Sequence, residues 1–110
     1  DGLFKYNPKL IVVDIRWIIK KIKNNPYVWT DPLNLRAVAK NIYDTFVEYD
    51  KSKESYYKEN YEKFLDEIDQ TFLKIKQKLN SCEVQYIYVF DDFWEYFAKR
   101  FGINIVFIEK

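Results

Sequence analysis

The sequence contains no histidine and only one cysteine, Cys82, among its 110 residues. The absence of histidine excludes a Ser-His-Asp or Cys-His catalytic arrangement and any proton transfer by an imidazole. A single cysteine excludes an internal disulfide and a cysteine-rich zinc site, and no neighbouring residue suggests a role for Cys82. The two glycines are too few for a glycine-rich phosphate-binding loop. These absences exclude most nucleophilic and nucleotide chemistries.

The sequence also lacks an excess of positive or negative charge, and it contains no long apolar run. Lys and Arg number 18 against 17 Asp and Glu, so the net charge of +1 predicts no general attraction to nucleic acid or to an anionic membrane. The longest apolar runs, such as Leu10–Val13 and Tyr86–Phe90, are far shorter than the roughly 20 residues that span a bilayer. The hydrophobic share of 48% supports one compact core. Because the chain begins with Asp1-Gly2 and has no methionine, we expect a portion of a longer protein.

The first half of the chain predicts one strand and one helix. Lys9–Ile15 is a β-branched run that predicts a buried strand, whereas the apolar residues of Arg16–Ile22 have helical spacing and the type of that segment stays open. A helix capped by Thr30 or Asp31 is expected to follow and to run to about Tyr49. Its inward-facing side chains recur at helical spacing: Leu35, Val38, Ala39, Ile42 and Phe46.

The middle of the chain predicts one long helix from about Ser52 to Asn80. No glycine or proline interrupts this stretch. Its apolar side chains recur every three or four residues: Tyr57, Tyr61, Phe64, Leu65, Ile68, Phe72, Ile75 and Leu79. At 1.5 Å per residue the helix would be about 40 Å long, as long as a small domain is wide. A helix of this length indicates either a coiled coil or a strut between two bodies.

The last 30 residues predict a strand, a short helix and a second strand. Val84–Phe90 and Ile103–Ile108 have the composition of strands. Asp91 or Asp92 is expected to cap the helix between them, and Gly102 to close it. Two parallel strands joined through a helix form a βαβ unit with a right-handed crossover.

Two stretches of the sequence together resemble the zinc/manganese solute-binding proteins of ABC transporters. Asn25–Asn34, which reads Asn-Pro-Tyr-Val-Trp-Thr-Asp-Pro-Leu-Asn, is similar to that family's Asp-Pro-His-x-Trp-x-Asp-Pro loop. Tyr88–Gly102 is similar to a second family segment, roughly His-Asp-Ala-Phe-x-Tyr-Phe-Ala-x-Arg-Tyr-Gly. The resemblance implies a helix-rich α/β fold in which residues 1–50 end an N-terminal lobe, residues 51–80 form the long linking helix, and residues 81–110 form the first βαβ unit of a C-terminal lobe.

The resemblance also implies positions for metal ligands. The family's second ligand, a histidine, corresponds to Tyr27, and its third, a histidine or glutamate, corresponds to Asp91. A carboxylate at Asp91 suits a hard cation such as manganese, whereas the neutral phenol of Tyr27 is a poor ligand for a divalent ion. The first and fourth ligands of complete members lie outside this chain, so we expect it not to bind zinc or manganese tightly by itself. The residues alone also allow another interpretation, in which Asp91 caps a helix and Tyr27 packs beside Trp29.

The family relationship implies a binding protein that is not an enzyme, with export to the periplasm or the cell surface. It also implies zinc or manganese as cargo with no other cofactor, and an ABC transporter permease as partner. A competing interpretation is a structural or protein-interaction module that lacks a metal site and forms a homo-oligomer through its long helix. A third, an acid/base enzyme using Asp91 and Asp92, is disfavoured because adjacent residues point in different directions. Four aromatic side chains are expected in the core: Trp29, Trp94, Tyr96 and Phe97.

Overall fold

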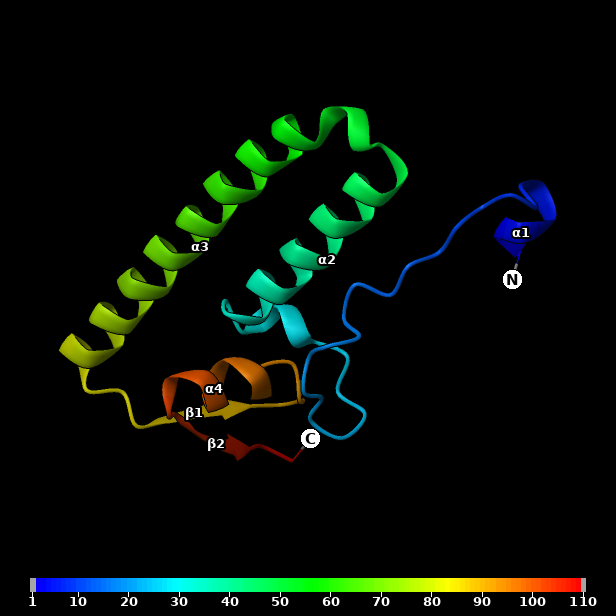
Figure 1. Ribbon diagram of the computed structural model, residues 1–110. Helices are drawn as coiled ribbons and strands as arrows, with labels where there is room; N and C mark the ends of the chain where they lie inside the picture. The colour runs from blue at the N-terminus through cyan, green and yellow to red at the C-terminus, as the bar shows by residue number, and fades with distance from the viewer. Residues whose placement is uncertain (1, 110) are drawn as a thin grey trace.

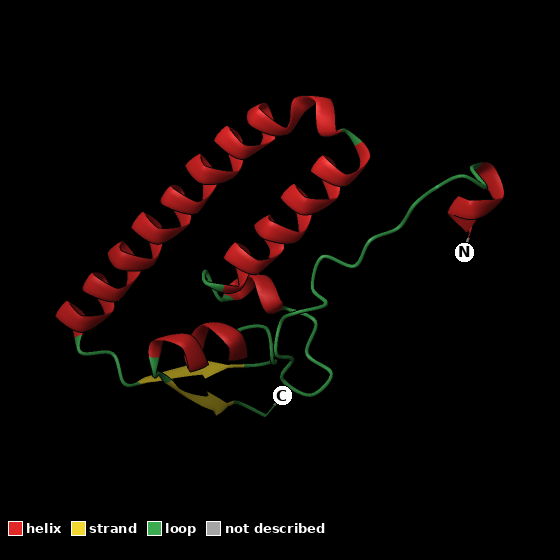
Figure 2. Cartoon of the chain, viewed as in Figure 1, coloured by secondary structure: helices red, strands yellow, loops and turns green. Residues whose placement is uncertain are grey.

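The protein, described by a computed structural model over residues 2–109, is dominated by helix. A short helix and an extended segment lead into a pair of helices that run in opposite directions, and the chain ends in a small βαβ unit (Figure 1, Figure 2). The elements are α1 (Gly2–Tyr6), the 3-10 turn η1 (Val28–Thr30), α2 (Asn34–Tyr49), the 3-10 turn η2 (Lys51–Lys53), α3 (Glu54–Cys82), β1 (Tyr86–Val89), α4 (Glu95–Phe101) and β2 (Asn104–Phe107). Across residues 2–109, no helix is both long and apolar enough to span a membrane.

Helix α3 runs without interruption, which confirms the single long helix that the sequence predicts. Its 29 residues extend about 43 Å at 1.5 Å per residue. One face packs on α2 through two stacked pairs of rings, Tyr43 with Tyr61 (centroids 4.8 Å apart) and Phe46 with Tyr57 (5.2 Å). The helix ends before Glu83, whose backbone is left-handed with a φ of 51°. The N-terminal half of α3 therefore packs its aromatic side chains on α2, whereas Phe72 further along the helix stacks on Phe101 of α4 (centroids 5.3 Å apart).

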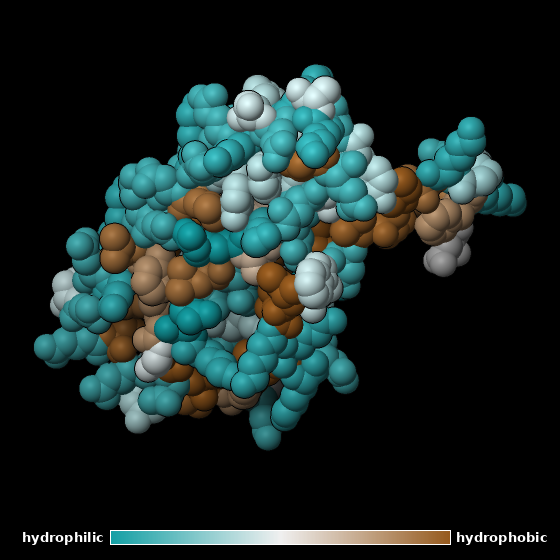
Figure 3. Space-filling view, in the orientation of Figure 1, coloured by the Kyte–Doolittle hydropathy of each residue, from teal (hydrophilic) through white to brown (hydrophobic). Residues whose placement is uncertain are grey.

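The strand predicted over Lys9–Ile15 is wrong. Within residues 2–109 this segment pairs with no strand, and Ile11, Val12 and Val13 are 58%, 66% and 41% exposed. Figure 3 shows apolar surface along the stretch that leads to α1. A β-branched run forms a strand only where a neighbouring strand accepts its backbone hydrogen bonds. The undecided segment Arg16–Ile22 forms turns.

The cap predicted for α2 is also wrong, although the helix ends at Tyr49 as expected. The helix begins after Leu33, which provides no side-chain cap. The Thr30 hydroxyl instead donates to the Tyr27 carbonyl oxygen at 2.9 Å, and Asp31 Oδ1 accepts the Leu33 N–H at 2.9 Å. Both side chains therefore shape the turn before the helix, because a local hydrogen bond competes with a capping one.

Strands β1 and β2 are parallel neighbours joined through α4, which confirms the predicted βαβ unit. Their register pairs Tyr86 with Asn104 and Val89 with Phe107. Helix α4 lies over one face of this two-stranded sheet (Figure 1). It ends at Gly102, whose φ of 67° is the left-handed conformation that favours glycine.

The cap predicted for α4 is wrong for a similar reason. The helix begins at Glu95 after Trp94, and no side chain caps it. Asp91 Oδ1 instead accepts the N–H of Phe93 at 3.0 Å. Asp91 and Asp92 therefore belong to the turn that follows β1, because the chain needs several residues there to reverse direction.

The core lies where the N-terminal segment meets α4. Three side chains form its centre, each at most 7% exposed: Ile19, Val28 and Tyr96. The predicted burial of Tyr96 is confirmed, and Phe97 is half-buried. The predicted burial of Trp29 and Trp94 is wrong, since these side chains are 50% and 44% exposed. Their rings lie at the rim of the core and pack edge-on against aromatic neighbours.

The link between α2 and α3 makes one part of the stability depend on pH. Asp50 accepts the hydroxyls of Ser52 (2.6 Å) and Tyr57 (2.9 Å), and these bonds hold the pKa of its carboxyl below the ordinary value. The ionised carboxylate therefore stabilises the fold above the pKa of the unfolded chain, and that contribution is lost as the pH falls through the lower pKa of the folded state.

We expect Tyr57→Phe to lower the melting temperature at neutral pH by a few degrees at most, because it removes one hydrogen bond to a half-buried carboxylate. The difference from the natural sequence should disappear in acid, where Asp50 is protonated. Thermal unfolding followed by circular dichroism at several pH values measures this, and Tyr56→Phe on an exposed neighbour is the matched control. A difference that stays constant across the pH range would contradict the assignment.

Candidate functional site

Tyr27 and Asp91, the two positions singled out by the sequence, lie in loops that meet. The Tyr27 ring packs edge-on against Trp29 (centroids 5.5 Å apart) and at a tilt against Phe93 (5.1 Å). Phe93 in turn donates its backbone N–H to Asp91 Oδ1. Tyr27 is half-buried and Asp91 is exposed. The predicted packing of Tyr27 beside Trp29 is confirmed, and Phe93 links the two loops.

The contact between residues 22–31 and residues 91–100, which we call the junction, is held by a buried tyrosine. The Tyr96 hydroxyl donates to the Asn25 carbonyl oxygen at 2.8 Å and accepts the Ile22 N–H at 2.9 Å. Both partners are backbone groups more than 70 residues away in the sequence. The Tyr96 hydroxyl therefore holds helix α4 against the N-terminal segment by donating one hydrogen bond and accepting another.

Asn25 is the second buried polar residue of the junction and is 4% exposed. Its Nδ2 donates to the Asp92 carbonyl oxygen at 2.6 Å, and its Oδ1 accepts the Tyr27 N–H at 2.9 Å. One amide therefore positions the loop of Tyr27 and the loop of Asp91 relative to each other. Buried amides of this kind are costly unless they are bonded, so the pairing of the two loops is specific.

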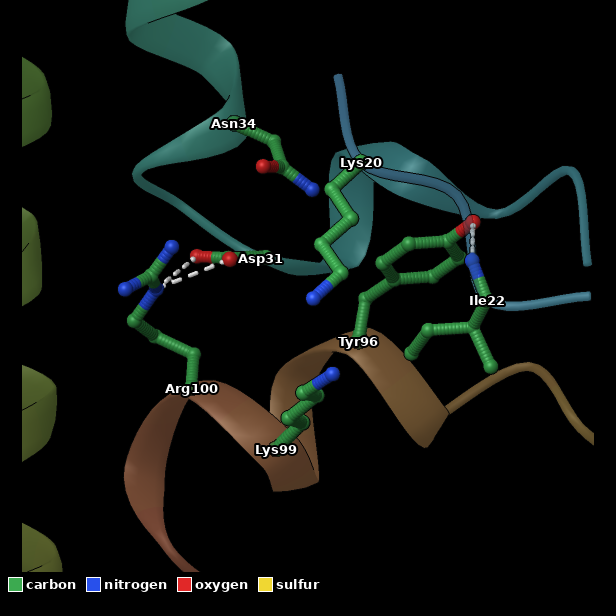
Figure 4. A pocket seen from close by; sticks show the side chains of 7 residues that line it. All are labelled: Lys20, Ile22, Asp31, Asn34, Tyr96, Lys99 and Arg100. Atoms are coloured by element: carbon green, nitrogen blue, oxygen red, sulfur yellow. Dashed lines mark hydrogen bonds and ion pairs between the residues drawn. The ribbon is translucent and has the colours of Figure 1, made fainter.

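An ion pair closes the other end of the junction. Arg100 Nε lies 2.8 Å from Asp31 Oδ2 and 3.0 Å from Oδ1, as Figure 4 shows. The Asp31 side chain is 7% exposed and that of Arg100 is 39% exposed. Removal of Arg100 would leave a buried carboxylate without a counter-charge, which is strongly unfavourable. The Asp31 carboxylate therefore stabilises the fold through this ion pair and is not available as a ligand for a metal ion.

The junction offers few ligands for a metal ion. Asp91 contributes a carboxylate and Tyr27 contributes a phenol, whereas first-row metal sites take about four converging N, O or S ligands. In the part of the chain that the structure describes, no group of three or more His, Cys, Asp or Glu side chains could hold a metal. The two loops place the carboxylate of Asp91 at the junction, but the donors there are too few to complete the coordination sphere of a metal ion.

Four residues of the junction lie outside the set of ligand positions that sequence reasoning identified: Asn25, Asp31, Tyr96 and Arg100. A partial signal for the last two was present, because residues four apart on a helix share a face. The sequence indicates no long-range partner for Asn25 or for Asp31. Their partners lie 67 and 69 residues away, and such long-range pairs leave no periodic trace in a single sequence.

Comparison with known protein families gives a match over residues 6–110 to the family model described as zinc-uptake complex component A, periplasmic (ZnuA). The chain belongs to the ZnuA family. Its ZnuA-type sequence is 28% identical over 91 residues to the metal ABC transporter substrate-binding lipoprotein SloC of Streptococcus mutans, covering 81% of this chain and 30% of SloC. It is 29% identical over 80 residues to the high-affinity zinc uptake system protein ZnuA of Paracoccus denitrificans, covering 73% of this chain and 24% of that protein.

Solved structures share the fold of this ZnuA-family chain. A crystal structure of ZnuA superimposes with a TM-score of 0.89 at 23% identity, over 98% of this chain and 44% of that one. The laminin-binding protein Lbp of Streptococcus pyogenes superimposes with a TM-score of 0.84 at 24% identity, over 99% and 44%. The chain thus spans less than half of these structures and less than a third of the curated relatives. Those relatives are transport proteins by name, which supports the prediction of a non-enzyme.

Tyr96→Phe tests the junction directly. We expect the variant to lower the free energy of unfolding by about 2 kcal/mol, because it leaves the Ile22 N–H and the Asn25 carbonyl buried without their partner. Equilibrium unfolding in urea measures the change. The control is Tyr88→Phe, which removes a hydroxyl from a side chain that is 70% exposed and should change stability by less than about 0.5 kcal/mol. Equal effects of the two variants would show that the hydroxyl does not hold the junction.

Proposed function

We propose that the chain is part of the substrate-binding component of an ABC transporter that takes up zinc or manganese. The whole protein would act in the periplasm or at the cell surface and deliver its metal to the transporter permease. The single observation that carries the proposal is the meeting of the Tyr27 and Asp91 loops, which hold the family's second and third ligand positions, at one junction. Membership of the ZnuA family supports a binding protein in place of an enzyme.

In this proposal the chain supplies the middle of a two-lobed protein. Residues 1–50 end the first lobe, residues 51–80 form the linking helix, and residues 81–110 begin the second lobe. The stiffness of one uninterrupted helix fixes the separation of its two ends, and the hydrogen bonds of Asn25 and Tyr96 fix the opposite side. A metal ion at the junction would then contact both lobes.

The ligand types decide how well such a site works. Asp91 is exposed and its Oδ1 already accepts one N–H, so it offers a carboxylate oxygen to a hard cation. Tyr27 offers a neutral phenol where zinc prefers an imidazole. The natural sequence should therefore bind zinc and manganese without a stoichiometric site of micromolar affinity or better.

Replacement of Tyr27 by histidine tests whether the junction has the geometry of a metal site. We expect Tyr27→His to bind zinc at least tenfold more tightly than the natural sequence, because it adds an imidazole next to the Asp91 loop. Isothermal titration with zinc and with manganese in chelator-treated buffer measures both affinities. Asp91→Ala in the Tyr27→His background should abolish the gain.

The control for this experiment is Tyr88→His, which places an imidazole on β1 outside the junction. It should bind zinc no better than the natural sequence. An equal gain from both histidines, or no gain from Tyr27→His, would argue against a metal site at the junction. A stoichiometric micromolar site in the natural sequence that disappears in Asp91→Ala would show instead that the Tyr27 position is compatible with tight binding.

A second candidate function is a protein-interaction module that self-associates. The face of the sheet opposite α4 is apolar and open, with Tyr86, Tyr88 and Phe90 57%, 70% and 63% exposed. Phe64 and Leu73 on α3 are 44% and 54% exposed. Exposed apolar side chains and unpaired strand edges of this kind mark sites of association.

We expect the 110-residue chain to be larger than a monomer at high concentration. Light scattering across a wide concentration range measures the mass. Tyr88→Glu should shift the population toward the monomer, because it places a charge on the open face of the sheet, whereas Tyr49→Glu at the exposed end of α2 should not. A monomer mass at every concentration would exclude this candidate and leave the metal-binding proposal untouched.

A further inference from the structure

A cavity of about 220 Å³ opens beside the junction, between α4, the beginning of α2 and the segment around Lys20. Figure 4 shows that Lys20 enters it from the N-terminal segment, that Lys99 and Arg100 enter it from α4, and that Asn34 stands at its α2 side. Three separate segments of the chain therefore meet around one small space. The cavity is separate from Tyr27 and Asp91, neither of which lines it.

The charges around this cavity are unbalanced. Lys20, Lys99 and Arg100 carry three positive charges, and Asp31 is the one carboxylate among the residues that line it. The Asp31 carboxylate is already paired with Arg100 Nε. Within residues 2–109, no carboxylate oxygen lies within 4.0 Å of the ammonium group of Lys20 or of Lys99. Figure 4 shows both ammonium groups directed into the space between α4 and the N-terminal segment.

We propose that this cavity binds a small tetrahedral oxyanion of the phosphate type, held between Lys20 and Lys99. Two ammonium groups directed into one recess repel each other until an anion lies between them, and charge-assisted hydrogen bonds from both would hold that anion. The net charge of the lining disfavours a metal cation. The Tyr96 hydroxyl takes no part in recognition, because both of its bonds are already used in the junction.

The size of the cavity is sufficient for a small inorganic anion. A water molecule occupies about 30 Å³ of liquid, so the space accommodates one inorganic oxyanion with a few waters. Because Lys20 lies on the N-terminal segment and Lys99 on α4, the bound anion would contact both of these segments. Binding to the folded state alone would then stabilise the fold by mass action.

Phosphate titration of the 110-residue chain tests the proposal. Amide chemical shifts are followed by NMR as inorganic phosphate replaces chloride. The ionic strength is held constant, because a change in ionic strength alone alters the interactions between charges and so also moves the chemical shifts. We expect saturable shifts at residues around Lys20 and Lys99 and a higher melting temperature in phosphate. Lys20→Gln combined with Lys99→Gln should weaken binding at least tenfold, since both charged donors are removed.

The matched control is Lys74→Gln combined with Lys78→Gln, which removes the same charge from exposed positions on α3. This control should bind phosphate as the natural sequence does, and an equal loss in both double variants would overturn the proposal. Shifts that do not saturate would also overturn it. Vesicles of phosphatidylglycerol, compared with phosphatidylcholine, test for a lipid headgroup as the source of the phosphate. Binding to the anionic vesicles that free phosphate displaces would overturn the assignment to a free anion.

Discussion

The arrangement of this chain depends on the hydroxyl of one buried tyrosine. Tyr96 extends from α4 into the small core beside Ile19 and Val28, and its hydroxyl bonds the backbone at Ile22 and at Asn25. A hydroxyl at this depth must find hydrogen-bond partners, because a buried polar group that is left unpaired destabilises the fold by about 1–3 kcal/mol. The position of α4, and with it that of the turn after β1, follows from satisfying those two backbone groups.

The polar groups of the junction divide into those used by the fold and those left for ligands. Asn25 uses its amide to align the Tyr27 and Asp91 loops, and the Asp31 carboxylate is neutralised by Arg100. Buried polar networks of this kind are stable only when every member is paired, so a ligand for a metal ion would have to come from a carboxylate outside this network, such as that of the exposed Asp91. The junction therefore offers few donors to a metal ion.

The small amount of apolar surface buried within residues 2–109 is the physical reason to expect self-association. Few hydrophobic side chains are buried, among them Ala98 and Ile103 near α4, while the open face of the sheet and the segment Ile11–Val13 expose large apolar groups. A small core leaves little stability beyond the cost of ordering the chain. Further protein surface, whether from the same polypeptide or from a second copy, would bury these groups and stabilise the fold.

The sequence by itself determined the long helix, the βαβ unit and the location of the Tyr27 and Asp91 loops. Helical periodicity without glycine or proline, and a glycine placed to end α4, are local signals that do not depend on the rest of the chain. The strand expected over Lys9–Ile15, the helix caps and the burial of Trp29 failed because each depends on a partner that the sequence does not name. A strand needs a neighbouring strand, a cap competes with other hydrogen bonds, and burial needs a second layer. Only the tertiary structure decided the pairing of Asp31 with Arg100 across 69 residues and the convergence of Lys20 with Lys99 on one cavity, because such contacts arise from packing distant segments together and leave no periodicity to detect.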